Sequence, residues 1–253
     1  MGLMQKPEWY ENASRLSVEQ LGRTLIVAPH QDDESLGCGG IIYLLTQLGT
    51  PVHVVFVSDG SMSHPDSEKY PLAKRISLRE EESRKALEIL GVPAEHITFL
   101  RLKDSQVPAM QMPGFDAAAD LIRGVISRFE PQTLFVPWRR DPHPDHRATW
   151  QIVDHAWTLQ QQTVRKLEYF IWLWERADSG DLPLPAECRV WTVDIKTAVA
   201  RKRQAIKAHV SQTTRLIDDD PQGFMLSEAV LSHFDKPFEV FIETYSNNRY
   251  VRS

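Results

Sequence analysis

The chain has 253 residues, 42% hydrophobic and 25% charged, and this length and composition suit one α/β domain over residues 1–253. Its 29 Lys and Arg against 34 Asp and Glu give a formal net charge of −5, which argues against a nucleic-acid partner. Cys38 and Cys188 form no Cys-x-x-Cys pair, no run of 18 apolar residues exists and residues 1–23 lack a signal-peptide pattern, so we expect a cytoplasmic protein without disulfides or a membrane span.

Strands and helices are expected to alternate along most of the chain. Apolar runs and amphipathic periodicity predict strand 24–28, helix 34–48, strand 52–58, helix 78–90, strand 98–102, helix 115–129, strand 133–136 and helix 148–160. Further strands are expected at 167–174, 189–194 and 238–244, with a helix at 196–209. The repeated order predicts a Rossmann-like, doubly wound, mostly parallel sheet with helices on both faces.

Ionisable residues gather directly after the first predicted strand. His30, Asp32 and Asp33 follow the apolar run 24–28 and precede a predicted helix. Open α/β sheets bind ligands at the carboxyl ends of their strands, and one His with two Asp supplies metal ligands with a carboxylate to spare. For this cluster alone a structural interpretation stays open, in which the acidic residues favour the start of the helix.

A second ionisable cluster follows the strand predicted at 133–136. His143, Asp145 and His146 lie in the run from Pro137 to Arg147. Taken alone, these residues are also explained by turns and helix capping beside proline. Two clusters that each follow a strand favour one shared site, because the carboxyl ends of parallel strands meet at one edge of a sheet.

The number of potential ligands suggests a division of roles. A catalytic zinc keeps three protein ligands and one open position, and His30, Asp33 and His146 supply two imidazoles and one carboxylate. Asp32 is then left over between two ligands, where a general base belongs. Iron(II) also accepts two His and one carboxylate, so we predict one divalent ion per chain, Zn²⁺ in first place and Fe²⁺ in second.

Several residues near these clusters carry further expectations. His143 is free to stabilise an oxyanion or to protonate a leaving amine, as an imidazolium that Asp145 or Asp141 favours, with Asp145 orienting its ring. Trp138 is a candidate for stacking on a sugar face. The polar segment 61–74 is either a lid over the site or a surface connection.

These motifs resemble those of the PIG-L / LmbE-like zinc-dependent N-deacetylases, which remove acetyl groups from N-acetylglucosamine. The run His30-Gln31-Asp32-Asp33-Glu34 is similar to the family's His-Pro-Asp-Asp-Glu, with Gln in place of Pro and no ligand lost. His143-Pro144-Asp145-His146 matches the family's His-Pro-Asp-His. Supporting similarities are Gly37-Cys38-Gly39-Gly40, Ser58-Asp59-Gly60, Arg79 to Glu82 and His209-Val210-Ser211-Gln212.

The resemblance implies a hydrolase that removes an N-acetyl group from an N-acetylglucosamine-type sugar or its conjugate. The implied roles are zinc binding by His30, Asp33 and His146, general base catalysis by Asp32, and an electrophilic or acid role for His143. Arg79 and Asp104 match positions that contact sugar hydroxyls. The implied partner is a small amino-sugar substrate, and a homo-oligomer is an open alternative to a monomer.

Three other functions are weighed against this one. Within the enzyme class, a zinc amidase that cleaves a larger amide, such as a thiol-sugar conjugate, is the second choice. A dinucleotide-binding oxidoreductase is disfavoured because the charged residues precede the glycines at 37–40 and no Gly-x-Gly-x-x-Gly spacing occurs. A sugar-binding protein without catalysis is disfavoured because binding alone has no use for Asp32.

Overall fold

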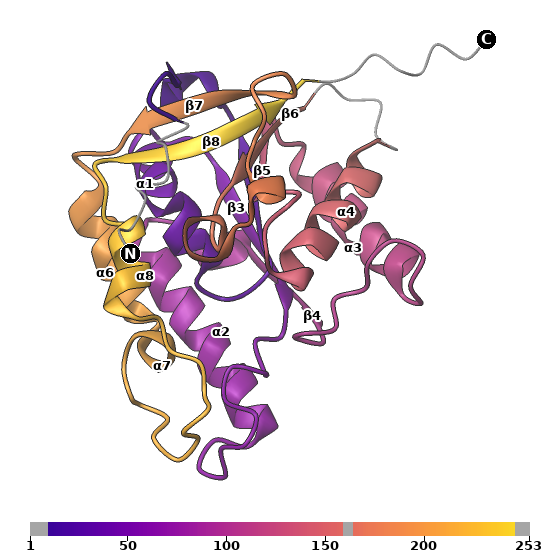
Figure 1. Cartoon of the computed structure of the whole chain (residues 1–253), viewed down its shortest axis with the longest axis vertical. Coiled ribbons are helices and arrows are strands. Elements are labelled where there is room, and N and C mark those ends of the chain that lie inside the picture. The colour runs from indigo at the N-terminus through magenta and orange to yellow at the C-terminus, as the bar shows by residue number, and fades with distance from the viewer. Residues whose placement is uncertain (1–9, 159–163, 246–253) are drawn as a thin grey trace.

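The computed structural model describes residues 10–158 and 164–245. Its described strands form one eight-stranded sheet in the order β1-β7-β8-β6-β5-β2-β3-β4 (Figure 1). The strands are β1 (Ser14–Arg15), β2 (Thr24–Ala28), β3 (Val52–Ser58), β4 (Ile97–Leu102), β5 (Thr133–Pro137), β6 (Arg165–Tyr169), β7 (Cys188–Asp194) and β8 (Phe238–Thr244). Strands β2 to β6 are parallel to one another, and β8 runs antiparallel between β6 and β7. The predicted mostly parallel sheet is therefore confirmed.

Helices cover both faces of the sheet. They are α1 (Asp33–Gln47), α2 (Leu72–Ile89), α3 (Phe115–Phe129), α4 (Pro144–Thr158), α5 (Leu173–Arg176), α6 (Val199–Ala208), α7 (Val210–Thr213) and α8 (Glu228–His233). Helices α1, α2 and α6 lie on one face, and α3 and α4 lie on the other (Figure 1). In β2, Ile26 packs into the core on the α1 face and Leu25 into the core on the α3 face, which is why this strand is apolar throughout.

The strand order reverses between β2 and β5. From β2 the chain adds β3 and β4 on one side, and it then crosses back to place β5 and β6 on the other side. Strands β2 and β5 pair in parallel, with Ile26 opposite Phe135. The two loops that leave their carboxyl ends therefore meet at the topological switch point, where open α/β sheets bind ligands.

Three predicted elements differ most from the observed ones. The helix predicted at 78–90 begins at Leu72, because Arg75 is buried and donates to the carbonyl oxygens of Ser61 and Tyr70 instead of facing solvent. The strand predicted at 167–174 is wrong beyond Tyr169, and residues 173–176 form α5. The helix predicted at 148–160 begins at Pro144, and its last two residues lie outside the described part of the chain.

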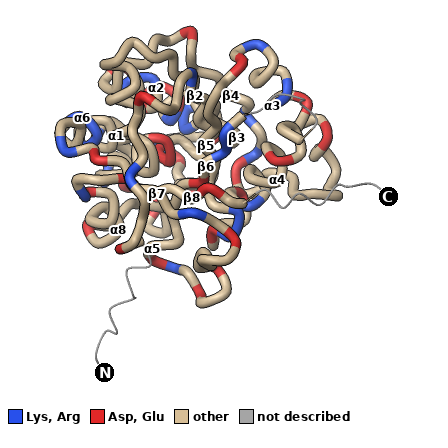
Figure 2. Tube along the Cα trace, turned by 90° about the horizontal axis from the view of Figure 1, so that it is seen from above, with Lys and Arg blue, Asp and Glu red and all other residues tan. Residues whose placement is uncertain are grey.

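Helix α6 carries four basic residues, of which three are exposed and one is buried. Arg201, Arg203 and Lys207 are exposed, but Lys202 is buried and its Nζ lies 2.7 Å from Glu239 Oε1. Figure 2 shows Lys and Arg gathered on α6, and acidic residues interspersed with basic ones along the rest of the described trace. Within the described ranges, no helix combines the length and the apolar character that a membrane crossing requires.

Candidate active site

Three side chains from the two switch-point loops form a triangle of potential metal ligands. His30 Nδ1 lies 3.3 Å from His146 Nε2 and 3.4 Å from Asp33 Oδ2, and His146 Nε2 lies 3.3 Å from Asp33 Oδ2. Ligand atoms around a tetrahedral ion with bonds of 2.0–2.1 Å stand about 3.3 Å apart. The triangle therefore has the dimensions of three corners of a tetrahedral metal site.

Carboxylates hold the outer nitrogens of both imidazoles. His30 Nε2 lies 3.3 Å from Asp104 Oδ1 and 3.3 Å from Asp145 Oδ2. His146 Nδ1 lies 3.3 Å from Asp141 Oδ1. A metal-ligating His usually directs its second nitrogen to a carboxylate or carbonyl, which fixes the ring and leaves the first nitrogen free for the ion. The donor set and its surroundings thus fit a divalent metal.

The charges of the triangle reinforce one another. Burial lowers the pKa of His146, but Asp33 and Asp141 outweigh burial and raise this pKa to about 9. Burial also lowers the pKa of His30, and the carboxylates of Asp104, Asp145 and Asp33 raise it well above its ordinary value. The carboxylates around the two rings therefore favour positive charge at this position. Protons on the rings supply such charge, and so does a bound divalent cation.

Two further groups of potential ligands in the described residues share His30. One adds His143 and His146, and the other adds Asp104 and Asp145. In the first group, His143 Nδ1 already accepts the backbone N–H of Asp145 at 3.2 Å. In the second, Asp104 Oδ2 accepts from Met62 N at 2.8 Å and Asp145 Oδ2 from Ser105 N at 2.8 Å. Asp33 Oδ2 likewise accepts a backbone N–H, that of His30 at 2.9 Å, so these hydrogen bonds do not rank the three groups.

Asp32 stands beside the triangle and outside it. Its carboxylate Oδ2 lies 3.5 Å from Arg79 Nη2. Burial raises the pKa of Asp32 to about 6, the Asp33 carboxylate adds to the rise, and Arg79 opposes it. The backbone of Asp32 has φ 148°. Two hydrogen bonds hold it there: Glu34 Oε2 accepts the Asp32 N–H at 3.0 Å, and Arg79 donates to the Gln31 carbonyl. Strained backbone of this kind clusters at functional sites.

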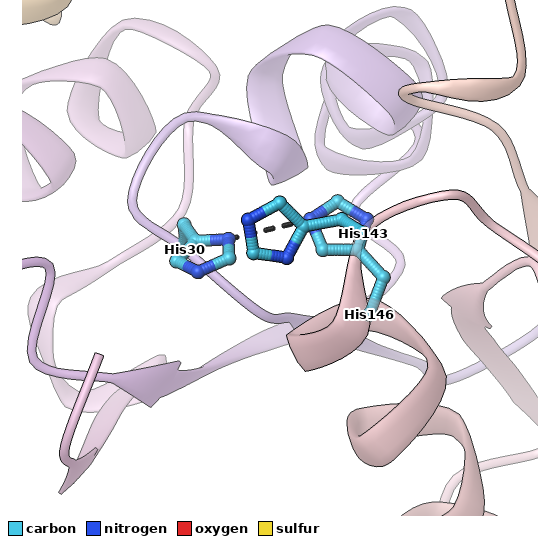
Figure 3. A group of neighbouring side chains, drawn as sticks. All are labelled: His30, His143 and His146. Carbon is cyan, nitrogen blue, oxygen red and sulfur yellow. Dashed lines mark hydrogen bonds between the residues drawn. The ribbon is translucent and has the colours of Figure 1, made fainter. Parts of the chain in front are cut away.

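His143 lies against the rings of the other two histidines. Its ring centroid is 4.8 Å from that of His30 and 4.9 Å from that of His146, and Figure 3 shows the three rings together. Burial and these two rings lower the pKa of His143 to about 4, although Asp145 acts in the opposite direction. These influences disfavour the imidazolium form that was expected for His143. Asp145 orients the His143 ring through its backbone N–H, whereas its carboxylate contacts His30 and the N–H groups of Ser105 and Val107.

A cavity of about 190 Å³ opens beside the triangle. Its wall includes every predicted site residue except Asp145 and His146. One side is polar and carries Arg79 and Asp104, the two residues matched to sugar contacts. The other side is apolar and contains Ile171, Trp172, Phe224 and Leu226. The cavity thus joins a potential metal site to a surface that is partly polar and partly apolar, as small-ligand sites are.

The segment predicted as a lid or surface connection forms part of the cavity wall. Met62 and Ser63 line the cavity, and the segment is tied to residues 218–224 across the entrance. Ser67 Oγ donates to Asp219 at 2.7 Å, Asp66 N donates to Asp220 at 3.0 Å, and Phe224 N donates to the Ser63 carbonyl at 2.6 Å. Two loops distant in sequence therefore build one rim of the cavity.

Trp138 and His209 both lie away from the cavity. Trp138 is fully buried, donates its Nε1 proton to the Asp181 carbonyl at 2.7 Å and packs on Phe170, so its expected stacking on a sugar is wrong. His209 is buried with its Nε2 3.0 Å from Glu34 Oε1, and thereby supports the residue that holds the Asp32 backbone.

Sequence reasoning did not assign Asp141 to His146, nor Trp172 and Gln212 to the cavity. Asp141 is fully buried, and it accepts the N–H of His143 at 3.0 Å and that of Trp172 at 3.0 Å besides contacting His146. Its place two residues before His143, in a Pro-rich turn, is a signal for such backbone capping. Gln212 belongs to the run His209-Val210-Ser211-Gln212 that resembles the family, but no spacing in the sequence places it or Trp172 in the cavity.

Comparisons with curated proteins give relatives that are mostly named deacetylases, together with a putative glucosamine-6-phosphate deaminase-like protein. The chain is 28% identical over 200 residues to a probable N-acetyl-alpha-D-glucosaminyl L-malate deacetylase 2 of Bacillus cereus. The matched region covers 77% of this chain and 86% of the relative. It is 30% identical over 238 residues to a 1D-myo-inositol 2-acetamido-2-deoxy-alpha-D-glucopyranoside deacetylase of Mycobacterium sp.. The matched region covers 79% of this chain and 77% of the relative.

Solved structures share the fold. An N,N'-diacetylchitobiose deacetylase from Pyrococcus horikoshii superposes with a TM-score of 0.61 at 23% identity, covering 77% of this chain and 72% of that chain. The zinc inhibited form of a teicoplanin deacetylase superposes with a TM-score of 0.64 at 21% identity, covering 89% of this chain and 99% of that chain. Residues 25–157, more than half of the chain, match the family PIG-L, described as GlcNAc-PI de-N-acetylase. With this match and the relative at 30% identity, the chain belongs to the PIG-L family.

Proposed function

We propose that this protein is a metal-dependent N-deacetylase that hydrolyses the acetamide of an N-acetylglucosamine-type sugar or of its conjugate. The observation that carries the proposal is the ligand triangle with sides of 3.3–3.4 Å beside the Asp32 carboxylate, which lines the cavity without belonging to the triangle. Family membership and the names of the relatives support the same chemistry. The substrate is a small amino sugar, which agrees with the size of the cavity.

His30, Asp33 and His146 would hold one divalent ion per chain. Two imidazoles and one carboxylate favour Zn²⁺, with Fe²⁺ as the second choice. When bound, the ion would polarise the acetamide carbonyl and lower the pKa of a water from 15.7 toward about 7. Because zinc inhibits one solved deacetylase with this fold, activity is best compared over several divalent ions and over a range of zinc concentrations.

Asp32 would act as the general base. Its carboxylate adjoins the triangle without belonging to it, and Arg79 helps keep it ionised against the effect of burial. Asp32 would take a proton from the attacking water and return it to the amine as the C–N bond breaks, which yields acetate and the free amino sugar. Arg79 and Asp104 line the cavity and are proposed to contact the sugar.

His143 would act as a neutral hydrogen-bond donor. The Asp145 N–H donates to His143 Nδ1, so the single proton of the neutral ring stands on Nε2. A lowered pKa keeps this neutral form across the physiological range. An Nε2–H group beside the triangle would stabilise the negative charge that develops on the acetamide oxygen.

Replacing His143 tests this donor role. We expect His143→Ala to keep the metal and to lower kcat by about 10²–10³, the loss typical of one transition-state donor. We expect His143→Gln, which offers an amide N–H, to recover part of that loss. Steady-state kinetics and metal content check both variants. If His143 instead delivers a proton, Gln will be as inactive as Ala.

Asp141→Asn is expected to weaken metal binding without removing a ligand. Its carboxylate orients the His146 ring and strengthens the ring nitrogen as a donor, and losing such a partner typically costs about 10–100-fold in metal affinity. Competition with a chelator of known affinity measures the change. Arg139, which lies nearby but contacts Glu187, provides a matched surface control as Arg139→Gln.

Acetate release tests the function as a whole. The purified protein is incubated with N-acetylglucosamine, its phosphate, its alkyl glycosides and its glycosides with malate and inositol, with and without added Zn²⁺ or Fe²⁺. We expect metal-dependent acetate release from at least one of these compounds and no release after a chelator has removed the metal. A larger amide cleaved while every acetamide stays intact would favour the alternative amidase.

A further inference from the structure

Gln212 is a polar residue in the apolar part of the cavity wall. It lies on α7, its side chain is fully buried, and it lines the cavity together with Trp172, Phe224 and Leu226. Its backbone carbonyl accepts the N–H of Leu226 at 2.8 Å, so Gln212 adjoins Leu226 in this wall. In a mostly apolar wall, one polar group fixes how a ligand is oriented.

A chain of hydrogen bonds fixes which end of the Gln212 amide faces the cavity. The buried Glu82 carboxylate accepts the Ser211 N–H at 2.7 Å and the Ser211 hydroxyl proton at 2.7 Å. A hydroxyl has one proton, so Ser211 Oγ then acts as an acceptor, and it receives the Gln212 Nε2–H at 2.8 Å. Turning the amide over would bring two acceptors together, so its orientation is set by the carboxylate.

The remaining atom of the amide, Gln212 Oε1, is a buried acceptor. No donor among the described residues reaches it. A buried acceptor without a partner costs folding free energy, because it has given up its bonds to water. An unmatched acceptor held rigidly at the wall of a cavity therefore indicates a ligand that brings its own donor.

We propose that Gln212 Oε1 accepts a hydrogen bond from an O–H or N–H group of the bound amino sugar and that this bond selects among substrates. The inference rests on the proposed function and adds a specificity residue to it. The remaining wall, formed by Trp172, Phe224 and Leu226, offers an apolar surface to the carbon face of the same molecule. Substrates that lack the matching donor leave the acceptor unpaired and are rejected.

Gln212→Met is the informative variant, because Met keeps the length of Gln and removes the acceptor. The probes are methyl N-acetylglucosaminide, its 3-, 4- and 6-deoxy analogues, and the analogue with a 2-O-acetyl ester in place of the amide. For the wild type with metal, we expect kcat/KM to fall about 10- to 100-fold for one analogue. For Gln212→Met, we expect a similar fall on the parent compound and little further change on that analogue. The analogue that shows this behaviour tells whether the donor is a hydroxyl or the amide N–H.

Calorimetric binding of methyl glucosaminide and its deoxy analogues gives a readout that does not need turnover. The deoxy position whose loss lowers kcat/KM should also weaken binding to the wild type relative to methyl glucosaminide. It should not weaken binding to Gln212→Met. If Gln212→Met fails to fold, Ser211→Ala replaces it, since the freed amide can turn and should weaken the discrimination several-fold. An equal loss on every analogue would overturn the inference and leave the function intact. No acetate release by the wild type from any probe would overturn both.

Discussion

Asp32→Asn is expected to retain the metal and to lose most of the deacetylase activity. The substitution removes the proton acceptor and keeps the shape of the side chain, and general base catalysis contributes about 10²–10⁴-fold. Asn also tolerates unusual backbone conformations better than most residues, which matters at a position with φ 148°. Acetate release per metal-loaded protein, with metal content from elemental analysis, measures the effect.

Asp33→Asn is the matched comparison for this variant. The two aspartates are neighbours, but only Asp33 Oδ2 lies within 3.4 Å of both imidazoles. We therefore expect Asp33→Asn to lose metal and activity together, whereas Asp32→Asn separates them. If Asp32→Asn instead loses the metal and Asp33→Asn keeps it, the two roles must be exchanged.

His146→Ala is expected to abolish both metal binding and activity. His146 is fully buried in the triangle, and the Nδ1 of the neighbouring His143 is already bonded to Asp145 N. Loss of one of three ligands removes the chemistry that the ion supplies, so we expect activity to fall by at least about 10³-fold. Elemental analysis and chelator competition measure the metal directly.

His53→Ala serves as the control for this loss. His53 is a half-buried histidine on β3 whose Nε2 lies 2.9 Å from Thr98 Oγ1, remote from the triangle. It should cost some stability and leave metal content and activity per folded molecule unchanged. Full metal occupancy in His146→Ala, checked against this control, would refute the ligand assignment.

The fold was predictable wherever local patterns and burial agree. The apolar runs at 24–28, 52–58 and 238–244 are strands with the predicted bounds, and the periodic segment 115–129 is a helix with the predicted bounds. The run 167–174 failed because a short apolar run does not distinguish a strand from a buried helix. There the Asp141 carboxylate accepts the N–H of Trp172, and the chain leaves the sheet to form α5.

The candidate site was predictable only in part. The clusters around His30 and His146 meet because each follows a parallel strand, and the adjacency of β2 and β5 brings them together. The charge state of His143 was not predictable, because it depends on burial and on rings from both loops. Gln212 was not identified either, since its orientation depends on Glu82, which lies on a different helix.

The separation of the two sides of the cavity bears on how such enzymes diversify. Every proposed ligand, the base and His143 lie within residues 25–157, the segment that matches the family. Trp172, Gln212, Phe224 and Leu226 lie beyond it, on short helices and loops that the sheet does not constrain. The proposed catalytic residues and this part of the cavity wall therefore belong to different stretches of the chain, although the proposed sugar contacts Arg79 and Asp104 belong to the first. Exchanging the second stretch between relatives offers a way to transfer substrate preference while leaving the hydrolytic centre intact.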